Sequence, residues 1–463
     1  MIDFVPHDYQ QYCIDWIVQN PYCGVFLDMG MGKTAITLSA INELKFNRWA
    51  VGRVLIIAPK KVAEATWRKE AAKWKQLKHL TFSEVLGSAA QRIRALNTPA
   101  DIYVINRENT QWLVDYYRHS WPFDTIIIDE SSSFKNPQAK RFKALKLIRS
   151  RTNRIVLLTG TPSPHGLLDL WSQIYLLDEG KRLGRTLTVY RDLYFVPDKR
   201  GRDMIYSYTL REGAAEAIQE AISDICISMK AEDYLTLPPI LYEDIPVVLD
   251  APAQKAYTRL ERDLLLPVSE DTVITAGSAA VLSGKLLQLC NGAVYDEDGL
   301  VNEIHNCKIE AFMETVEQLH GQSAVVYYNF QHDLTRLLAA LSKTKLRVRV
   351  YRGAQDEDDW NAGKIDILLA QPQSCSYGLN LQEGGWHEIW FGLIQSLEQY
   401  QQANRRLYRQ GQTHPVIVHH LIVQGGRDED VIKSLNSYAD VQDSLIESLC
   451  VRIRRVREEV AAA

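Results

Sequence analysis

The chain lacks the features of membrane and secreted proteins. It has no run of about 18 uncharged apolar residues, so we expect no helix that spans a bilayer. Its N-terminus has neither a basic region nor an apolar segment, so we expect no secretory signal. Its seven cysteines are scattered without a C-x-x-C pair, which argues against a zinc site and a disulfide framework and favours a reducing cytoplasm.

Net charge is also small, at −4 over 463 residues, and by itself gives no sign of a polyanionic partner. The distribution is uneven, because residues 1–237 carry 32 basic and 26 acidic side chains, whereas residues 238–463 carry 21 and 31. Two stretches are strongly basic, 45–78 and 134–154, and the second contains no acid. Such stretches are typical of a nucleic-acid footprint or, alternatively, of solvated helix faces.

Short runs of β-branched and aromatic residues alternate with longer helix-like segments in both halves of the chain. In the first half we expect strands at Gly24–Leu27, Val54–Ala58, Ile102–Ile105, Thr125–Ile128 and Ile155–Thr159. In the second half we expect them at Ala324–Tyr328, Val348–Tyr351, Ile365–Ala370, Glu388–Phe391 and Val416–Ile422. This alternation predicts an α/β fold with two successive doubly wound parallel sheets.

The boundary between the two α/β lobes is expected at Leu237-Pro238-Pro239, because two prolines interrupt any helix. The predicted domains are therefore 1–237 and 238–463. Residues 177–234 depart from the alternation, and we interpret them as a small, partly helical insertion in the first lobe.

The strongest local pattern is a glycine-rich turn between a strand and a helix, Asp28-Met29-Gly30-Met31-Gly32-Lys33-Thr34. Glycines let backbone N–H groups point at phosphate oxygens, and the following helix adds its positive N-terminal dipole. We expect Lys33 to reach the β- and γ-phosphates of a nucleoside triphosphate and Thr34 to hold Mg²⁺. The other predicted phosphate-binding residues are Met29, Gly30, Met31 and Gly32.

A second pattern supports this phosphate site. The apolar strand of Thr125-Ile126-Ile127-Ile128-Asp129-Glu130 ends in two acids, and an acid at the tip of a buried strand is costly unless it binds a cation. We expect Asp129 to hold Mg²⁺ and Glu130 to orient and deprotonate the attacking water. Together the two patterns predict an enzyme that hydrolyses ATP or a related triphosphate.

These motifs, in this order, resemble superfamily two helicases and more closely the Swi/Snf-type (Snf-two) ATPases, over almost the whole chain. Asp8-Tyr9-Gln10 is similar to the family's Q motif, which implies that Gln10 reads the adenine of ATP. Leu158-Thr159-Gly160-Thr161-Pro162 is similar to motif III, which implies that its central residues couple nucleotide state to the nucleic-acid track. These coupling residues are Thr159, Gly160 and Thr161. The resemblance also implies two RecA-like lobes, an ATP-binding lobe and a helicase C-terminal lobe, with ATP and Mg²⁺ as cofactors.

The segment from Gln402 to Gln412 resembles motif VI, Q-A-x-x-R-x-x-R-x-G-Q. Residues three apart lie on one face of a helix, so we expect Arg406 and Arg409 to point the same way. The resemblance implies that both are arginine fingers, which contact the γ-phosphate and assist its transfer.

The remaining motifs imply a nucleic-acid track. Ala58-Pro59-Lys60-Lys61 resembles motif Ia, Asn106-Arg107-Glu108 lies where the next track motif is expected, and Gly378-Leu379-Asn380-Leu381 resembles motif V. Contacts of this kind reach the phosphate backbone and carry no sequence preference. The implied nucleic-acid-binding residues are Lys60, Lys61, Asn106, Gly378 and Asn380.

The resemblance implies an ATP-dependent translocase on double-stranded DNA that remodels or displaces bound proteins. The chain is expected to be a compact motor of the kind found in bacteria and bacteriophages, monomeric and in the cytoplasm of a bacterial or phage-infected cell, with no membrane partner. Three alternatives stay open: a strand-separating DNA or RNA helicase, a motor subunit of a restriction or defence assembly, and a non-catalytic DNA-binding or inhibitory protein.

Overall fold

The computed structural model describes residues 3–164, 166–198, 208–235, 237–265, 276–296, 298–375 and 379–439. The chain divides into two compact units, and among the described residues those up to 235 belong to unit 1 and those in 237–437 to unit 2. Leu237-Pro238-Pro239 lies beside this division, and the domain bounds 1–237 and 238–463 stay a prediction. No helix in these ranges combines the length and the apolar content that crossing a bilayer requires.

Unit 1 is built on a parallel sheet of seven strands. Its order is β3 (Phe82–Val85), β4 (Ile102–Asn106), β2 (Val54–Ala58), β5 (Thr125–Asp129), β6 (Arg154–Thr159), β1 (Tyr22–Leu27) and β9 (Cys226–Met229). The central strands β2 and β4 are buried along their whole length, as expected for a sheet with helices on both faces.

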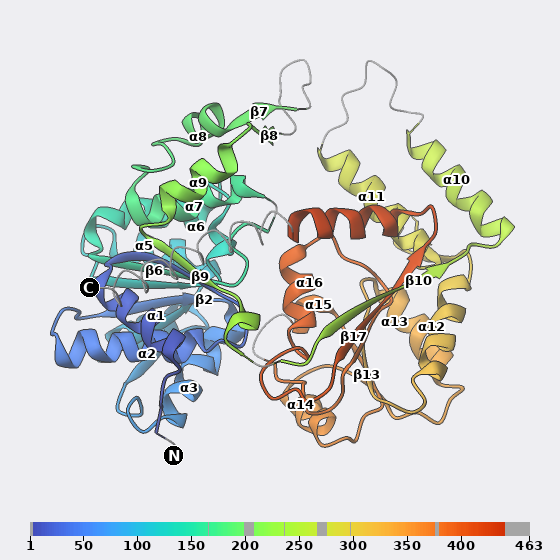
Figure 1. Cartoon of the computed structure of the whole chain (residues 1–463), viewed down its shortest axis with the longest axis horizontal. Helices are drawn as coiled ribbons and strands as arrows, with labels where there is room; N and C mark the ends of the chain where they lie inside the picture. The colour runs from blue at the N-terminus through green and yellow to red at the C-terminus, as the bar shows by residue number, and fades with distance from the viewer. Residues whose placement is uncertain are drawn as a thin grey trace. The chain divides into compact units, whose positions relative to one another are not determined.

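Helices cover both faces of this sheet (Figure 1). They are α1 (Asp8–Gln19), α2 (Lys33–Asn42), α3 (Trp67–Lys73), α4 (Ala89–Asn97), α5 (Thr110–Tyr117), α6 (Lys140–Ile148), α7 (Leu170–Asp178), α8 (Leu187–Tyr194) and α9 (Ala214–Ile222). On one face Phe26, Tyr103 and Ile126 form a buried cluster with Phe142 of α6 and Ile174 of α7. A short antiparallel pair, β7 (Phe195–Pro197) and β8 (Tyr208–Leu210), lies outside the main sheet.

Unit 2 contains a parallel sheet of six strands. Its order is β10 (Ile240–Val247), β17 (Val416–Val423), β16 (His387–Trp390), β13 (Ala324–Tyr327), β15 (Ile367–Ala370) and β14 (Val348–Val350). The antiparallel pair β11 (Ala293–Tyr295) and β12 (Val301–Glu303) is separate from it.

The helices of unit 2 are α10 (Ala251–Leu265), α11 (Ala276–Cys290), α12 (Cys307–Gln318), α13 (Gln331–Leu341), α14 (Ala354–Asn361), α15 (Pro372–Cys375) and α16 (Leu397–Asn404), and residues 427–437 are also helical. On one face Val326 and Ile389 pack with Phe312 of α12 and Leu337 of α13. On the other face the Tyr327 hydroxyl donates a hydrogen bond of 3.0 Å to the Ala403 carbonyl, which ties α16 to the sheet.

The α/β class with two doubly wound lobes is confirmed, and each of the ten expected strands is present, with ends that differ by at most a few residues. Among the strands described in the two parallel sheets, β3, β9 and β10 were not expected from the sequence, and neither were the short antiparallel strands β7, β8, β11 and β12. Cys226–Met229 lies in the segment expected to be an insertion, yet it pairs with β1 and completes the edge of the sheet. The polar Ser228 interrupts the apolar pattern of these four residues, and its hydroxyl donates a hydrogen bond to the Phe26 carbonyl. Pairing with β1 therefore makes this segment a strand, because its own sequence has no clear strand pattern.

Candidate active site

The predicted site residues of unit 1 follow the carboxyl ends of neighbouring strands. In the sheet order, β2, β5, β6 and β1 are adjacent, so the segments after them gather at one edge. The register pairs Asp129 with Leu158 and Phe26 with Thr159, which sets motif II beside motif III and motif III beside the glycine-rich turn. Ligands of open α/β sheets bind at this edge.

The glycine-rich turn joins β1 to α2, which begins at Lys33. Gly30 and Gly32 both have φ of 82°, a left-handed conformation that other residues rarely adopt. The Lys33 ammonium donates to the carbonyls of Leu27 at 2.7 Å and Asp28 at 3.2 Å, at the base of the same turn. The cation that is expected to bind phosphate therefore lies inside the loop that is expected to cradle it.

Gln10 is buried and contacts the glycine-rich turn directly. Its amide nitrogen donates to the Met31 carbonyl at 3.3 Å, and its oxygen accepts the His7 backbone N–H at 3.0 Å. The Tyr9 hydroxyl donates to the same Met31 carbonyl at 3.2 Å, and burial raises the pKa of Tyr9 to about 12, so the phenol stays protonated. Both side chains thus fix the turn, and the role of Gln10 in reading adenine stays a prediction.

The two acids of motif II are in different environments. Desolvation at the end of β5 raises the pKa of Asp129 to about 6, against the opposing effect of the nearby Lys33 ammonium, although part of the residue is still exposed. Glu130 has φ of 53° and ψ of 60°, which is uncommon for a residue with a side chain and frequent at functional sites. The chain turns there into η4, a short 3-10 helix (Ser131–Phe134).

Motif III packs against the base of the glycine-rich turn. A Cβ at Gly160 would lie 3.2 Å from the Leu27 carbonyl oxygen, so only glycine lets the two loops approach without a shift. Thr159 and Thr161 are buried, and the Thr159 hydroxyl accepts the Thr161 backbone N–H at 3.0 Å. The structure therefore brings the predicted coupling residues next to the predicted phosphate loop.

The donors available at this edge suit a magnesium ion. Thr34 and Asp129 provide a hydroxyl and a carboxylate, which are hard oxygen ligands. Within the described residues there is no group of three His, Cys, Asp or Glu side chains that could hold a metal by itself. Magnesium bound with a nucleotide is usually held through one or two carboxylates plus substrate phosphates, so this donor set fits.

The predicted track residues differ in exposure. Lys60 and Lys61 are exposed after β2, at the same edge of the sheet as the glycine-rich turn. Asn106 is buried, and its amide is engaged within its own turn, donating to Glu108 at 2.8 Å and accepting from Asn109 at 2.5 Å. Its geometry suits shaping of the turn more than contact with a nucleic acid.

Motif VI differs from expectation in its secondary structure. Helix α16 ends at Asn404, so Arg406 and Arg409 lie in the turns that follow and not on a helix face. Just after the end of this helix, the Leu381 N–H donates a hydrogen bond to the Arg406 carbonyl. This hydrogen bond connects the chain after α16 to motif V. The two guanidinium groups nevertheless converge, because they donate to the Leu379 carbonyl at 3.2 and 3.0 Å.

Motif V itself is only partly described. Asn380 is exposed, and its backbone N–H donates to Glu357 at 2.9 Å. Burial raises the pKa of Glu357, while Arg406 and Arg409 act in the opposite direction. Gly378, also predicted to contact nucleic acid, lies outside the described residues.

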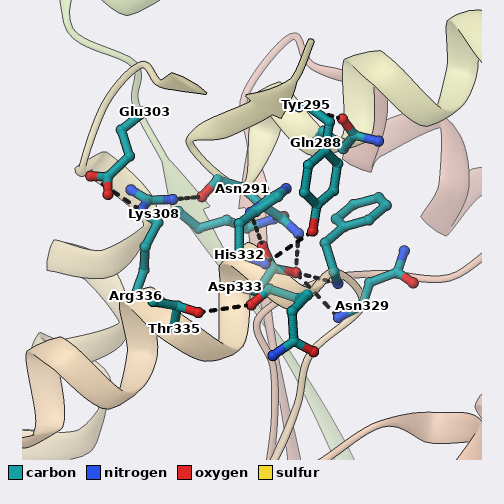
Figure 2. Close-up of polar contacts among 12 residues, drawn as sticks. Gln288, Asn291, Tyr295, Glu303, Lys308, Asn329, His332, Asp333, Thr335 and Arg336 are labelled. Carbon is teal, nitrogen blue, oxygen red and sulfur yellow. Dashed lines mark hydrogen bonds and ion pairs between the residues drawn. The ribbon is translucent and has the colours of Figure 1, made fainter. Parts of the chain in front are cut away.

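A buried polar network supports the loop after β13 in unit 2 (Figure 2). Lys308 is fully buried and donates to Asp428 at 2.7 Å and to the Asn291 side-chain oxygen at 2.9 Å. The Asn291 amide in turn donates to Asp333 at 2.9 Å. The same Asp333 oxygen accepts the backbone N–H of Phe330 at 2.8 Å, so α12 and the end of α11 are linked to the start of α13.

Sequence reasoning missed two residues of unit 1 that contact the candidate site. Tyr9 was quoted only as part of a motif, although its hydroxyl contacts the phosphate loop. Gln173 links the segments after β5 and β6 through its side-chain amide. The available signal was a single glutamine within the apolar run of α7, where a polar residue needs a partner.

Comparisons with known proteins identify the family. The SNF2-related domain family matches residues 9–292. The protein p41 of Acyrthosiphon pisum secondary endosymbiont phage 1 is 37% identical over 461 residues, which cover 97% of this chain and 99% of p41. The Bacillus subtilis protein YwqA, described as an ATP-dependent helicase/translocase, is 25% identical, with 95% of this chain covered. Human ZRANB3, a DNA annealing helicase and endonuclease, is 25% identical over 92% of this chain.

The similarity extends over only part of the longer relatives, since it covers 48% of YwqA and 39% of ZRANB3. Among solved structures, the SWI2/SNF2 ATPase core of Sulfolobus solfataricus in complex with double-stranded DNA is 22% identical. The match covers 91% of this chain and 88% of that one, with a TM-score of 0.46. On the family match over more than half of its residues and the similarity to p41, the chain belongs to the SNF2-related family of helicase-like ATPases.

Proposed function

We propose that the chain is an ATP-dependent translocase that moves on double-stranded DNA and remodels or displaces proteins bound to it. The observation that carries the proposal is the convergence of the glycine-rich turn, Asp129-Glu130 and Thr159–Thr161 at one edge of the unit 1 sheet. The descriptions of YwqA as a helicase/translocase and of ZRANB3 as a DNA annealing helicase support a DNA substrate.

The nucleotide would bind at the glycine-rich turn of unit 1. Lys33 exchanges its carbonyl partners for phosphate oxygens, and the N–H groups at the start of α2 point toward the same anion. Thr34 and Asp129 would hold Mg²⁺, which neutralises charge on the phosphoryl oxygens when bound. Glu130 orients the attacking water and accepts its proton.

The second lobe would supply arginine fingers. Arg406 and Arg409 share the Leu379 carbonyl within unit 2, so they are already held as a pair. On this proposal both guanidinium groups leave the carbonyl for the γ-phosphate, which forms stronger charge-assisted hydrogen bonds. The ATP-binding lobe is then 1–237 and the C-terminal lobe 238–463.

The DNA backbone would follow Lys60, Lys61, Gly378 and Asn380. Exposed lysines at the carboxyl edge of a sheet bind phosphates and release counterions, without reading sequence. Replacing Lys60 and Lys61 with alanine should lower the slope of log affinity against log salt by about 0.9 for each phosphate that the protein no longer neutralises. We further propose a monomer in the cytoplasm of a bacterial or phage-infected cell, which the similarity to a phage protein supports.

An ATPase assay with duplex DNA, single-stranded DNA and RNA tests the proposal. Duplex DNA should stimulate hydrolysis most, Lys33→Ala should abolish hydrolysis, and Arg409→Ala should reduce it by about 10³-fold. Arg349→Ala is the matched control, because this half-exposed arginine of β14 pairs with Asp356 and Asp359 of α14, neither of which is a predicted site residue.

The outcomes separate the alternatives. Equal hydrolysis with and without nucleic acid would refute the translocase proposal, and preferential stimulation by single strands or RNA would indicate a strand-separating helicase. DNA binding with hydrolysis no greater than that of Glu130→Gln would indicate a non-catalytic protein. Displacement of a third strand from a triplex then reports movement itself, and stable co-purification with a nuclease or methyltransferase would indicate a defence assembly.

A further inference from the structure

One buried amide connects the segment after the motif II acids with motif III. The side chain of Gln173 is fully buried on α7. Its oxygen accepts a hydrogen bond from the Ser131 hydroxyl at 2.8 Å, and its nitrogen donates to the Pro162 carbonyl at 2.7 Å. The nitrogen also donates to the Asp169 carbonyl at 3.0 Å, one turn earlier on the chain.

The buried position of Gln173 makes the loss of these hydrogen bonds costly. Helix α7 is apolar on almost all sides and packs against β1, β6 and η4, so an unsatisfied amide there would be costly. The amide is planar, and its oxygen and nitrogen therefore keep a constant separation. A movement of Ser131 must either carry the Pro162 carbonyl with it or break a buried hydrogen bond.

Both ends of this link adjoin predicted functional residues. Ser131 directly follows Glu130, whose left-handed backbone turns the chain at the end of β5. Pro162 directly follows Thr161 and lies two residues after the glycine that packs on the Leu27 carbonyl. The two segments follow neighbouring strands, and the side chain of Gln173 joins them through hydrogen bonds at both of its ends.

We propose that Gln173 is a positioning residue that transmits displacement of motif III to Glu130, so that nucleic-acid binding accelerates water activation. The inference rests on the proposed function, because it assumes that motif III responds to the nucleic-acid track. Gln173 contacts neither nucleotide nor nucleic acid in this role. It sets how Glu130 is held when motif III moves.

A purely structural role predicts a different result. A buried polar residue that only stabilises the unit would, when replaced, lower the melting temperature and leave the kinetics of the folded fraction unchanged. A positioning residue changes kcat with little effect on the KM for ATP, because the phosphate loop is untouched. It also changes the ratio of DNA-stimulated to DNA-free kcat, which stability alone does not affect.

The test uses Gln173→Met, which keeps the length of the side chain and removes its hydrogen bonds, and Ser131→Ala, a smaller change at the other end of the link. The matched control is Ser172→Ala, which removes a partly buried hydrogen bond of 2.6 Å to the Lys135 carbonyl from the adjacent position of α7. We expect Gln173→Met and Ser131→Ala to lower the stimulation ratio by about tenfold, with KM within about twofold. Ser172→Ala should lower only the melting temperature.

The double variant Ser131→Ala with Gln173→Met should be no worse than the more impaired single variant, since both act through one contact. An unchanged stimulation ratio in either single variant, or additive losses in the double variant, would overturn the inference. Should Gln173→Met not fold, Ser131→Ala decides alone. A wild type that duplex DNA does not stimulate would instead refute the proposed function, and the positioning role would then require a lower DNA-free kcat in Gln173→Met than in Ser172→Ala.

Discussion

Replacing Lys308 with methionine should destabilise unit 2 severely. Lys308 is fully buried, and its ammonium bonds Asp428 at 2.7 Å and Asn291 at 2.9 Å. Methionine keeps much of the apolar stem, so the loss is mainly electrostatic. It removes the ammonium from the buried Asp428 carboxylate, which still accepts the Val423 N–H at 3.1 Å. Removing one partner of a buried ion pair typically costs about 3–5 kcal/mol.

Amide hydrogen exchange in β17 and α12 is the appropriate assay, because it reports the opening of unit 2 alone. Denaturation of the whole chain is unsuitable, since two compact units need not unfold in one step. Lys433→Met is the matched control: its pair with Glu429, at 3.6 Å, is exposed, and its loss should cost less than about 1 kcal/mol.

A second substitution distinguishes two causes of this destabilisation: the lost attraction between Lys308 and Asp428, and the cost of leaving the buried Asp428 carboxylate unpaired. Asp428→Asn in the Lys308→Met background removes the uncompensated carboxylate and should restore at least about half of the lost stability. The reasoning is refuted if Lys308→Met changes exchange in β17 no more than Lys433→Met does. It is also refuted if the second substitution adds a further loss, because the buried charge would then not be the cause.

Three further predictions concern other parts of the chain. Burial lowers the pKa of His387 to about 4, so the fold favours the neutral ring while the unfolded chain takes up a proton near pH 6.5. The free energy of unfolding of unit 2 should therefore fall by about 2 kcal/mol between pH 7 and pH 5. His387→Gln should make hydrogen exchange in β16 depend less on pH. An equally steep pH dependence in this variant would contradict the prediction. A Cβ at Gly32 would lie 2.6 Å from the Gln10 amide nitrogen, and Gly32 itself has φ of 82°. Gly32→Ala should therefore weaken ATP binding by about tenfold or more, as measured with a fluorescent ATP analogue. Unchanged affinity would refute the assignment of this loop to phosphate binding. Glu130→Gln should retain ATP binding and slow single-turnover hydrolysis by about 10²–10⁴-fold, and a rate near that of wild type would remove Glu130 from its assigned role.

The fold was largely predictable because the central strands contain apolar runs that are buried on both faces of the sheet. Val54–Ala58 and Thr125–Asp129 can be recognised without knowledge of their neighbours, since a sheet covered on both faces requires such runs. Edge strands have weaker patterns. Phe82–Val85 alternates buried and half-buried positions, and most of Ile240–Val247 is exposed, so pairing with a neighbouring strand decides their structure.

The candidate site was predictable to the level of which loops meet, and not to the level of side-chain contacts. Because the sheet is parallel, the carboxyl ends of its strands lie at one edge, and this brings Asp129 and Thr159 together. Whether a side chain faces the site depends on tertiary contacts that no motif encodes. Asn106 is turned into its own loop by Glu108, and Arg406 lies beyond the end of a helix because motif V holds its carbonyl.

The cations expected to act on ATP share a feature across the two units. Lys33 lies on the carbonyls of Leu27 and Asp28, and Arg406 and Arg409 lie on the Leu379 carbonyl. Neutral carbonyls satisfy the donors of these cations, yet they bind a cation more weakly than a phosphate oxygen does, because the phosphate adds the attraction of a full negative charge.

On the proposed function, each cation is held within its own unit by a carbonyl that a phosphate oxygen would displace. The side chains do not have to be drawn from solvent and ordered when the nucleotide binds, so less conformational entropy is lost at that step. On the proposed function, loss of the γ-phosphate on hydrolysis would return each cation to a carbonyl within its own unit. On that proposal the partner of each cation depends on whether the γ-phosphate is present, as an ATP-driven motor requires of its nucleotide site.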